Sequence, residues 1–220
     1  MSFKKSAVMT IYRYILLGLV MAASNAANSD TVSQRLSALL QPIETLSASF
    51  SQQLFDADGT LIESAEGVFK LAKPGKMLWH IIEPMEQKLV SDGTVLWIYD
   101  PDLEQVVIES FTDKIKTTPI TLLTGDVTDL DERYTIALKE TAKDTVLFTL
   151  TPSNSSSLFS HIAIEFMGSI PQSIAIMDTF DQRTVIEFGE LSVNPILDDA
   201  IFSFVIPNQV DVINNVRLSL

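Results

Sequence analysis

The chain has 220 residues, of which 15 are basic and 28 are acidic, and it contains no cysteine. Its length suits one well-packed domain, and 46% hydrophobic with 20% charged residues is a globular rather than a disordered composition. The missing cysteines exclude disulfide scaffolds, thiolate zinc sites and thiol nucleophiles, and the formal charge of −13 disfavours nucleic acid as a partner.

The first segment has the features of an export signal. Lys4, Lys5 and Arg13 precede an apolar run at 15–23, and small residues follow it. That run is about half as long as a helix that spans a bilayer. We therefore expect residues 1–26 to be a cleavable secretory signal peptide, with an uncleaved anchor as the alternative, and residues 27–220 to form a single exported domain. Cleavage removes three basic and no acidic residues, which changes the charge from −13 to −16.

A helix is the first element predicted in the remaining chain. Its apolar residues recur at helical spacing from Val32 to Ile43, so they form one stripe. Asp30 is the predicted N-cap, and Pro42 limits the C-terminal end. The stripe indicates that one side of this helix packs on the rest of the domain.

Strands follow the helix, because the apolar spacing changes from helical to alternating. Turn residues separate the runs at 56–59, 73–76, 83–84, 92–93 and 100–102. A short helix is predicted at 117–123, where Thr118-Pro119 suits a helix start and Gly125 a stop. Alternation returns at 134–138, 146–150, 162–166, 174–176 and 185–191. Short runs joined by tight turns predict an α+β fold that is mainly an antiparallel meander.

Large apolar residues occupy both alternating positions in the first half of this meander. Between Met77 and Ile82, for example, only His80 is polar. A sheet with one face in water should carry polar residues at every second position, so this pattern indicates a cover on both faces. Two interpretations remain open: an ordinary core with helices on one side, or a sheet that meets its helices loosely and leaves an apolar cavity.

Catalytic and metal-binding patterns are weak. His80 and His161 lie in strand patterns without the spacing of paired metal ligands. No Gly-x-Ser-x-Gly elbow, Walker loop or Gly-x-Gly-x-x-Gly sequence occurs, and the acidic pairs suit solvated turns. We expect no enzyme activity, no catalytic residue, no metal site and no cofactor.

Several segments resemble a known family. They are Lys73-Pro74-Gly75-Lys76-Met77-Leu78-Trp79, Glu83-Pro84, the block from Leu89 to Val106, Thr118 to Gly125, and Asp198 to Pro207. In this order they are similar to the periplasmic outer-membrane lipoprotein carrier family, LolA. The similarity covers residues 30–213, and the block from Ser91 to Val106 is its most specific part.

The resemblance implies a half-open, unclosed antiparallel β-barrel with a lid of short α-helices that encloses an apolar cavity for the acyl chains of lipoproteins. We expect the lid to contribute apolar side chains from both helices and the sheet to contribute large ones from its inner side. The lipid-binding candidates are Leu36, Leu39, Leu40, Ile120, Leu122 and Leu123 on the lid and Phe50, Phe69, Met77, Trp79 and Ile81 on the sheet. Alternation alone does not decide which set of strand positions faces the cavity.

Two positions depart from the usual family pattern. Lys73 stands where Arg is usual, so we expect it to latch the lid through an ammonium rather than a guanidinium group. Met77 stands where Phe is usual and should make the cavity rim more adaptable.

The implied function is a monomeric periplasmic carrier. It would take acylated lipoproteins from an ATP-driven, ABC-type inner-membrane complex and deliver them to an outer-membrane receptor. One alternative is a periplasmic lipid- or lipoprotein-sensing module on the same half-barrel, which should have a further C-terminal domain. An exported lipid hydrolase is the other alternative, but it would need a nucleophile and base that we do not find. The pathway's receptor should carry a lipobox cysteine, which this chain lacks.

Overall fold

The computed structural model describes residues 31–111, 121–124, 127, 129–155 and 157–216. The expected signal peptide at 1–26, the Thr118-Pro119 helix start and Ile120 lie outside these residues. None of the helices in the described part of the chain has the length and hydrophobicity needed to cross a membrane.

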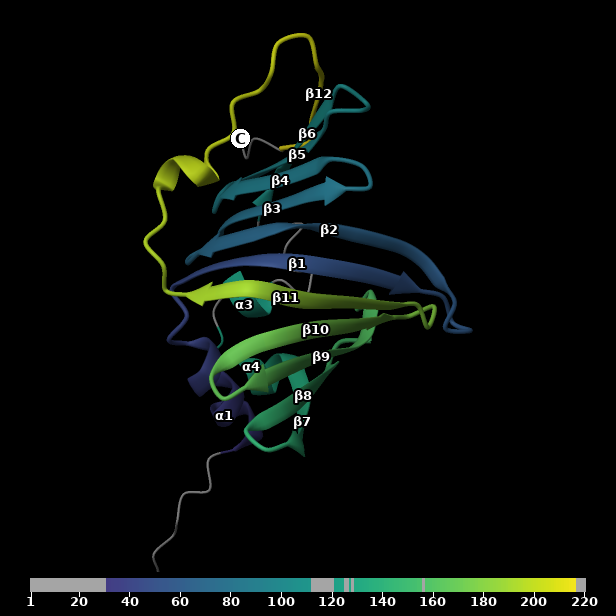
Figure 1. The fold of residues 1–220 in the computed structure, drawn as a ribbon, viewed down its shortest axis with the longest axis vertical. Coiled ribbons are helices and arrows are strands. Elements are labelled where there is room, and N and C mark those ends of the chain that lie inside the picture. Colours follow the sequence, from purple (N-terminus) through teal and green to yellow (C-terminus); the bar gives the residue numbers. More distant parts are fainter. Residues whose placement is uncertain (1–30, 112–120, 125–126, 128, 156, 217–220) are drawn as a thin grey trace, which may run out of the picture. The chain divides into compact units, whose positions relative to one another are not determined.

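The described chain is built on one large sheet (Figure 1). The strands are β1 (Thr45–Phe55), β2 (Leu61–Ala72), β3 (Lys76–Glu83), β4 (Gln87–Asp92), β5 (Val95–Asp100), β6 (Gln105–Ser110), β7 (Tyr134–Ala142), β8 (Thr145–Pro152), β9 (Phe159–Met167), β10 (Ile170–Asp178), β11 (Arg183–Val193) and β12 (Asp211–Asn214). Their order is β12-β6-β5-β4-β3-β2-β1-β11-β10-β9-β8-β7. Because β7 and β12 are its two edges and do not pair with each other, the sheet of the described residues is unclosed.

Nearly all neighbouring strands run antiparallel, which confirms the predicted meander. The exception is β12, which pairs in parallel with β6. Asp92 shows how the sequence sets a tight turn: its carboxylate accepts hydrogen bonds from the amides of Thr94 and Val95, and Gly93 supplies a φ of +95°. The hairpins β1–β2 and β10–β11 extend beyond the ends of the neighbouring strands (Figure 1).

Few helices accompany the sheet. They are α1 (Val32–Leu40), α3 (Thr121–Thr124), α4 (Leu130–Arg133) and the 3₁₀ helix η1 (Asp199–Phe202). The predicted N-cap Asp30 was wrong, because Thr31 caps α1: its hydroxyl accepts from the Gln34 amide, and the Gln34 side chain accepts from the Thr31 amide. Helices α1 and α4 contact each other and β7.

The sheet has two different faces. We call the side that carries Phe50, Phe69 and Trp79 the inner face, because these residues share one hydrophobic cluster with α1, α3 and α4. The opposite side, which carries Ser49, Val68 and His80, is the outer face. A segment from 194 to 216, here the C-terminal segment, follows β11 and includes η1 and β12.

The C-terminal segment explains why both faces of β3–β6 are apolar. Its Phe204 ring lies 6.4 Å from Trp97 and 5.6 Å from Tyr99, which point to the outer face. Phe202 is fully buried, and η1 contacts β3 and β4. Lys76 also holds η1 through an ion pair to Asp199 at 2.8 Å. The outer side around Trp97 and Tyr99 is therefore covered by protein.

Candidate functional site

Strand register places the sheet-side candidates together. Phe69 lies opposite Trp79, Phe50 lies opposite Gly67, and Gly67 lies opposite Ile81. Leu71, two residues from Phe69, lies opposite Met77. All five candidates (Phe50, Phe69, Met77, Trp79 and Ile81) therefore share the inner face, the face that packs against the helices.

The aromatic members of this set form one contact group. The Phe50 and Trp79 rings stack with centroids 4.0 Å apart, and Phe69 lies 5.3 Å from Trp79. Gly67 makes room for this stack, since a Cβ there would lie 2.8 Å from Cζ of Phe50 and would collide with the carbonyl oxygen of His80. The glycine thus allows Phe50 to lie flat across β2.

The helices supply the other side of the cluster. Leu36 and Leu40 of α1 are fully buried, as are Leu122 and Leu123 of α3. Leu39 is partly buried and packs against the same cluster. Of the lid-side candidates, only Ile120 lies outside the described residues.

The expected apolar cavity is not seen among the described residues. Phe50, Phe69, Met77 and Trp79 are each less than 10% exposed and pack in the same cluster as the α1 and α3 leucines. A hollow of about 530 Å³ does exist, but its lining includes Ser49, Val68 and Glu187. These three residues stand at outer-face positions, and the lining also includes Phe50, Gly67 and Phe188, which stand at inner-face positions. Because most of its lining belongs to the outer face, the hollow differs from the expected cavity between helices and sheet.

Helix α1 is tied to the sheet at its C-terminal end. Nζ of Lys73, in the turn between β2 and β3, donates a hydrogen bond of 2.8 Å to the carbonyl oxygen of Leu40. The Lys73 amide also donates to the Glu44 carbonyl at 2.9 Å. The ammonium group therefore satisfies a carbonyl in the last turn of α1, where a positive charge is also favoured by the helix dipole.

A second tie holds the linker between α1 and β1. The Asn194 side chain accepts hydrogen bonds from the amides of Glu44 and Thr45 and donates one to the Pro42 carbonyl. Asn194 has a φ of +57°, a conformation that asparagine tolerates better than most residues. No local pattern in the sequence points to this residue, because its partners lie about 150 positions away.

Helix α1 also has polar contacts with the segment around α4. The Ser33 hydroxyl donates to the Asp131 carboxylate at 2.7 Å, and the Ser37 hydroxyl donates to the Val127 carbonyl at 3.3 Å. Most of the helix surface toward the sheet is apolar, so α1 is attached by a few polar contacts around a hydrophobic interface.

The two histidines do not come together. His80 Nε2 lies 3.0 Å from Glu86, which also contacts Lys88 at 2.8 Å, and His161 lies beside Ser160. The hydrogen bonds from Lys88 and His80 lower the pKa of the Glu86 carboxyl group. Among the described residues, no group of three or more histidine and acidic side chains is placed to hold a metal ion.

Comparison with known proteins identifies the family. The model of the outer membrane lipoprotein carrier protein LolA matches residues 41–205. The outer-membrane lipoprotein carrier protein of Azotobacter vinelandii is 39% identical over 93% of this chain and 99% of that protein. The protein of the same name from Pseudomonas aeruginosa is 38% identical over 89% of this chain and 94% of that one.

A solved structure supports the fold alone. An uncharacterized conserved protein from Thermus thermophilus aligns with 84% of this chain and 100% of its own, with a TM-score of 0.55 and 10% identity. The sequence relatives and the family model carry the assignment. The chain belongs to the LolA family of outer membrane lipoprotein carrier proteins.

Proposed function

We propose that this chain is a periplasmic carrier that binds the acyl chains of lipoproteins and escorts them to the outer membrane. The observation that carries the proposal is the hydrophobic cluster between the inner face and helices α1 and α3, together with membership of the carrier family. The carrier acts by binding and release rather than by catalysis. Residues 1–26 direct export and are removed, and residues 27–220 form the single functional domain.

The proposed binding site is the interface between helices and sheet. The arrangement described here is closed, with the leucines of α1 and α3 covering the inner face. Acyl chains would take the place of these leucines against the rings of Phe50, Phe69 and Trp79 when the helices move away. The closed lid and the open cavity are thus two states of the same interface between helices and sheet. Lys73 latches the closed state through its hydrogen bond to the Leu40 carbonyl.

The energetics explain why such an interface suits a carrier. An acyl chain of about sixteen carbons gains roughly 12 kcal/mol when it leaves water, at about 0.8 kcal/mol per CH₂. A permanently open apolar cavity would hold several chains too tightly to release them. Because the lid covers its own lining when empty, part of the binding free energy is used to open it, which lowers the net affinity and makes transfer reversible.

The partners follow from this cycle. An ATP-driven inner-membrane complex supplies the work that places acyl chains in the carrier, and an outer-membrane receptor with a higher affinity takes them. The charge of −16 after signal cleavage discourages the carrier from remaining on anionic lipid surfaces. We propose that the carrier is monomeric.

Release from spheroplasts tests the function. Purified residues 27–220 should bring labelled triacylated lipoprotein into the supernatant as a soluble complex, whereas serum albumin at equal concentration should not. The same protein should bind a fluorescent palmitate analogue, and free palmitate should displace it. A folded protein that neither releases lipoprotein nor binds palmitate would contradict the proposal.

A further inference from the structure

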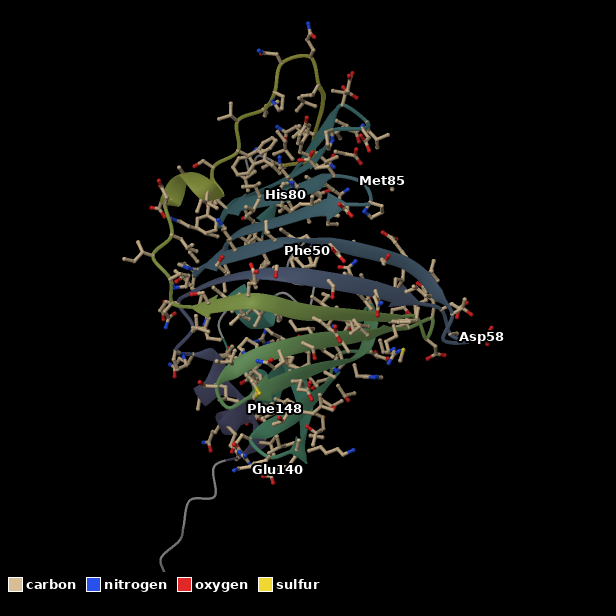
Figure 2. The ribbon with its side chains drawn as sticks, in the orientation of Figure 1. Phe50, Asp58, His80, Met85, Glu140 and Phe148 are labelled. Atoms are coloured by element: carbon tan, nitrogen blue, oxygen red, sulfur yellow. The ribbon has the colours of Figure 1, made fainter. Side chains whose placement is uncertain are left out.

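The outer face of the sheet is only partly covered. The C-terminal segment packs on β3–β6 through Phe202 and Phe204, as described above. Apart from the hydrogen bond from the Thr45 hydroxyl to the Pro195 carbonyl at the start of β1, Figure 1 shows no described element over the outer side of β11, β1 and β2. This uncovered area lies over the middle of β1, the position that Phe50 marks in Figure 2.

The uncovered area is hollowed. The hollow of about 530 Å³ is lined on β1 by Ser49 and Ser51 and on β11 by Gly189. Gly189 lies opposite Ser49, and a Cβ on it would lie only 2.8 Å from the Ser49 hydroxyl. These three small residues line the hollow together with Phe50, Gly67 and Phe188. We call this feature the outer hollow.

Apolar side chains stand at the β2–β3 side of the outer hollow. Val68 lies directly opposite Ser49, and Ile82 follows on β3. Ile82 is 50% exposed, which is high for an isoleucine in a strand. An irregularity in the β2–β3 pairing between Glu66 and Gly67 places Ile82 at this wall.

Three carboxylates cross the outer hollow in one row. Ser51 lies opposite Glu187 on one side and Glu66 on the other, and Glu66 lies opposite Glu83. All three glutamates line the hollow, and none of them is in a salt bridge of the described residues. Glu66 and Glu83 are directly opposite each other, and like charges across a strand pair destabilise a sheet, so this pair costs folding free energy.

We propose that the outer hollow is a docking surface for a protein segment that presents arginine or lysine beside apolar side chains. The inference rests on the proposed function, since a carrier must be recognised by the proteins that load and unload it. The carboxylate row matches guanidinium or ammonium groups, and Val68 and Ile82 match the apolar ones. The apolar inner face remains reserved for acyl chains, so cargo and partner protein can be bound together.

The negative charge of the outer hollow argues against a membrane surface or a second copy of this chain as its partner. An anionic membrane surface would be repelled by the carboxylate row. A second copy of this chain carries a net charge of −13, or −16 after signal cleavage, so electrostatics disfavour pairing of two copies here. A cationic protein segment is the occupant that the surface complements.

Nuclear magnetic resonance with a defined probe tests the site. The probe is a peptide that repeats Gly-Arg-Leu, and its counterpart repeats Gly-Glu-Leu. The arginine peptide should shift the amide resonances of Ser49, Val68 and Gly189 in a saturable way, and the glutamate peptide should not. Free arginine should shift them only weakly, because it lacks the apolar contact.

Three variants test whether the three carboxylates and the outer hollow are responsible for peptide binding. The triple variant Glu66→Gln/Glu83→Gln/Glu187→Gln should weaken peptide binding on the order of ten-fold and raise Tm by about 1–3 °C. The matched control Asp58→Asn/Asp102→Asn/Asp181→Asn makes the same change in charge at hairpin turns and should retain most of the affinity. Ser51→Tyr fills the hollow at constant charge and should also weaken binding.

Three results would overturn the proposal. If the control triple weakened binding as much as the glutamate triple, or if Ser51→Tyr bound normally, the attraction would be a diffuse charge effect. Shifts confined to inner-face amides would assign the peptide to the acyl site instead. A failure of this docking proposal can be distinguished from a failure of the carrier function. The glutamate triple variant should bind palmitate normally, whereas its loading with lipoprotein from the inner membrane should fall.

Discussion

Replacing Lys73 by methionine tests whether the lid is latched. The variant keeps most of the length of the side chain but removes the ammonium group that donates to the Leu40 carbonyl at 2.8 Å. The backbone bond from the Lys73 amide to Glu44 is unaffected by this change. The Leu40 carbonyl lies in the last helical turn, where water can replace the lost donor when α1 moves.

The expected change in acyl-chain affinity follows from the loss of the hydrogen bond between Lys73 and the Leu40 carbonyl. A hydrogen bond with a charged partner contributes about 1.5–3 kcal/mol, and the lower end applies because Lys73 is only partly buried. A loss of about 1.5 kcal/mol from the closed state shifts the ratio of closed to open by about ten-fold. If the closed state predominates in the empty carrier, the affinity for an acyl chain should rise by a similar factor.

Two measurements check this expectation. Titration with a fluorescent palmitate analogue should show about ten-fold tighter binding by Lys73→Met, and amide exchange in α1 should accelerate while the strands stay unchanged. Lys76→Met is the matched control, because it removes an ammonium group from the same turn region but breaks the ion pair to Asp199 instead. Unaltered exchange in α1, or an equal gain in affinity for Lys76→Met, would refute the latch.

Three further predictions concern single side chains. Lys73→Arg should tighten closure and slow cargo transfer to the receptor several-fold, because a guanidinium group can donate two bonds; equal transfer rates in a reconstituted release assay would count against it. Gly67→Ala should lower the free energy of unfolding by about 2 kcal/mol in urea titrations, since its methyl group meets the Phe50 ring and the His80 carbonyl. Glu86→Gln should reduce the loss of stability in acid. The pKa of Glu86 is lower in the folded chain than the ordinary 4.5, so its contribution is present above that pH and disappears as pH falls; the effect should stay below about 1 kcal/mol because the carboxylate is exposed.

The strands and their turns could be predicted because their signals are local. Alternating apolar residues and turns such as Asp92-Gly93 depend on neighbours within a few positions. Helix α4 and helix η1 were not predicted, since each has only four residues and shows no period. The N-cap prediction missed by one residue because the Thr31–Gln34 capping box is stronger than a lone aspartate.

The inner and outer faces could not be told apart from local sequence. Trp97 and Tyr99 look like core residues, and they are covered, but by Phe204 from a segment about a hundred positions later. The same limit applies to the outer hollow, because Glu66, Glu83 and Glu187 become neighbours only through the register of four strands. By contrast, the candidates Phe50, Phe69 and Trp79 were found together because large aromatics at like positions of adjacent strands share a face.

In the proposed carrier cycle, the contacts of α1 would let the apolar interface between helix and sheet be both stable and separable. Leu36 and Leu40 lose exposure to water in the closed state, and an acyl chain that enters would restore that burial against the same rings, so the two states differ little in apolar area. In the proposed cycle, the balance between the two states would be set by the few polar contacts of α1, of which the Lys73 bond to the Leu40 carbonyl joins the helix to the sheet. In that cycle a single polar side chain in a turn would adjust the affinity for lipid without contacting the lipid, and a lysine at that position would let the carrier open with less work than an arginine would.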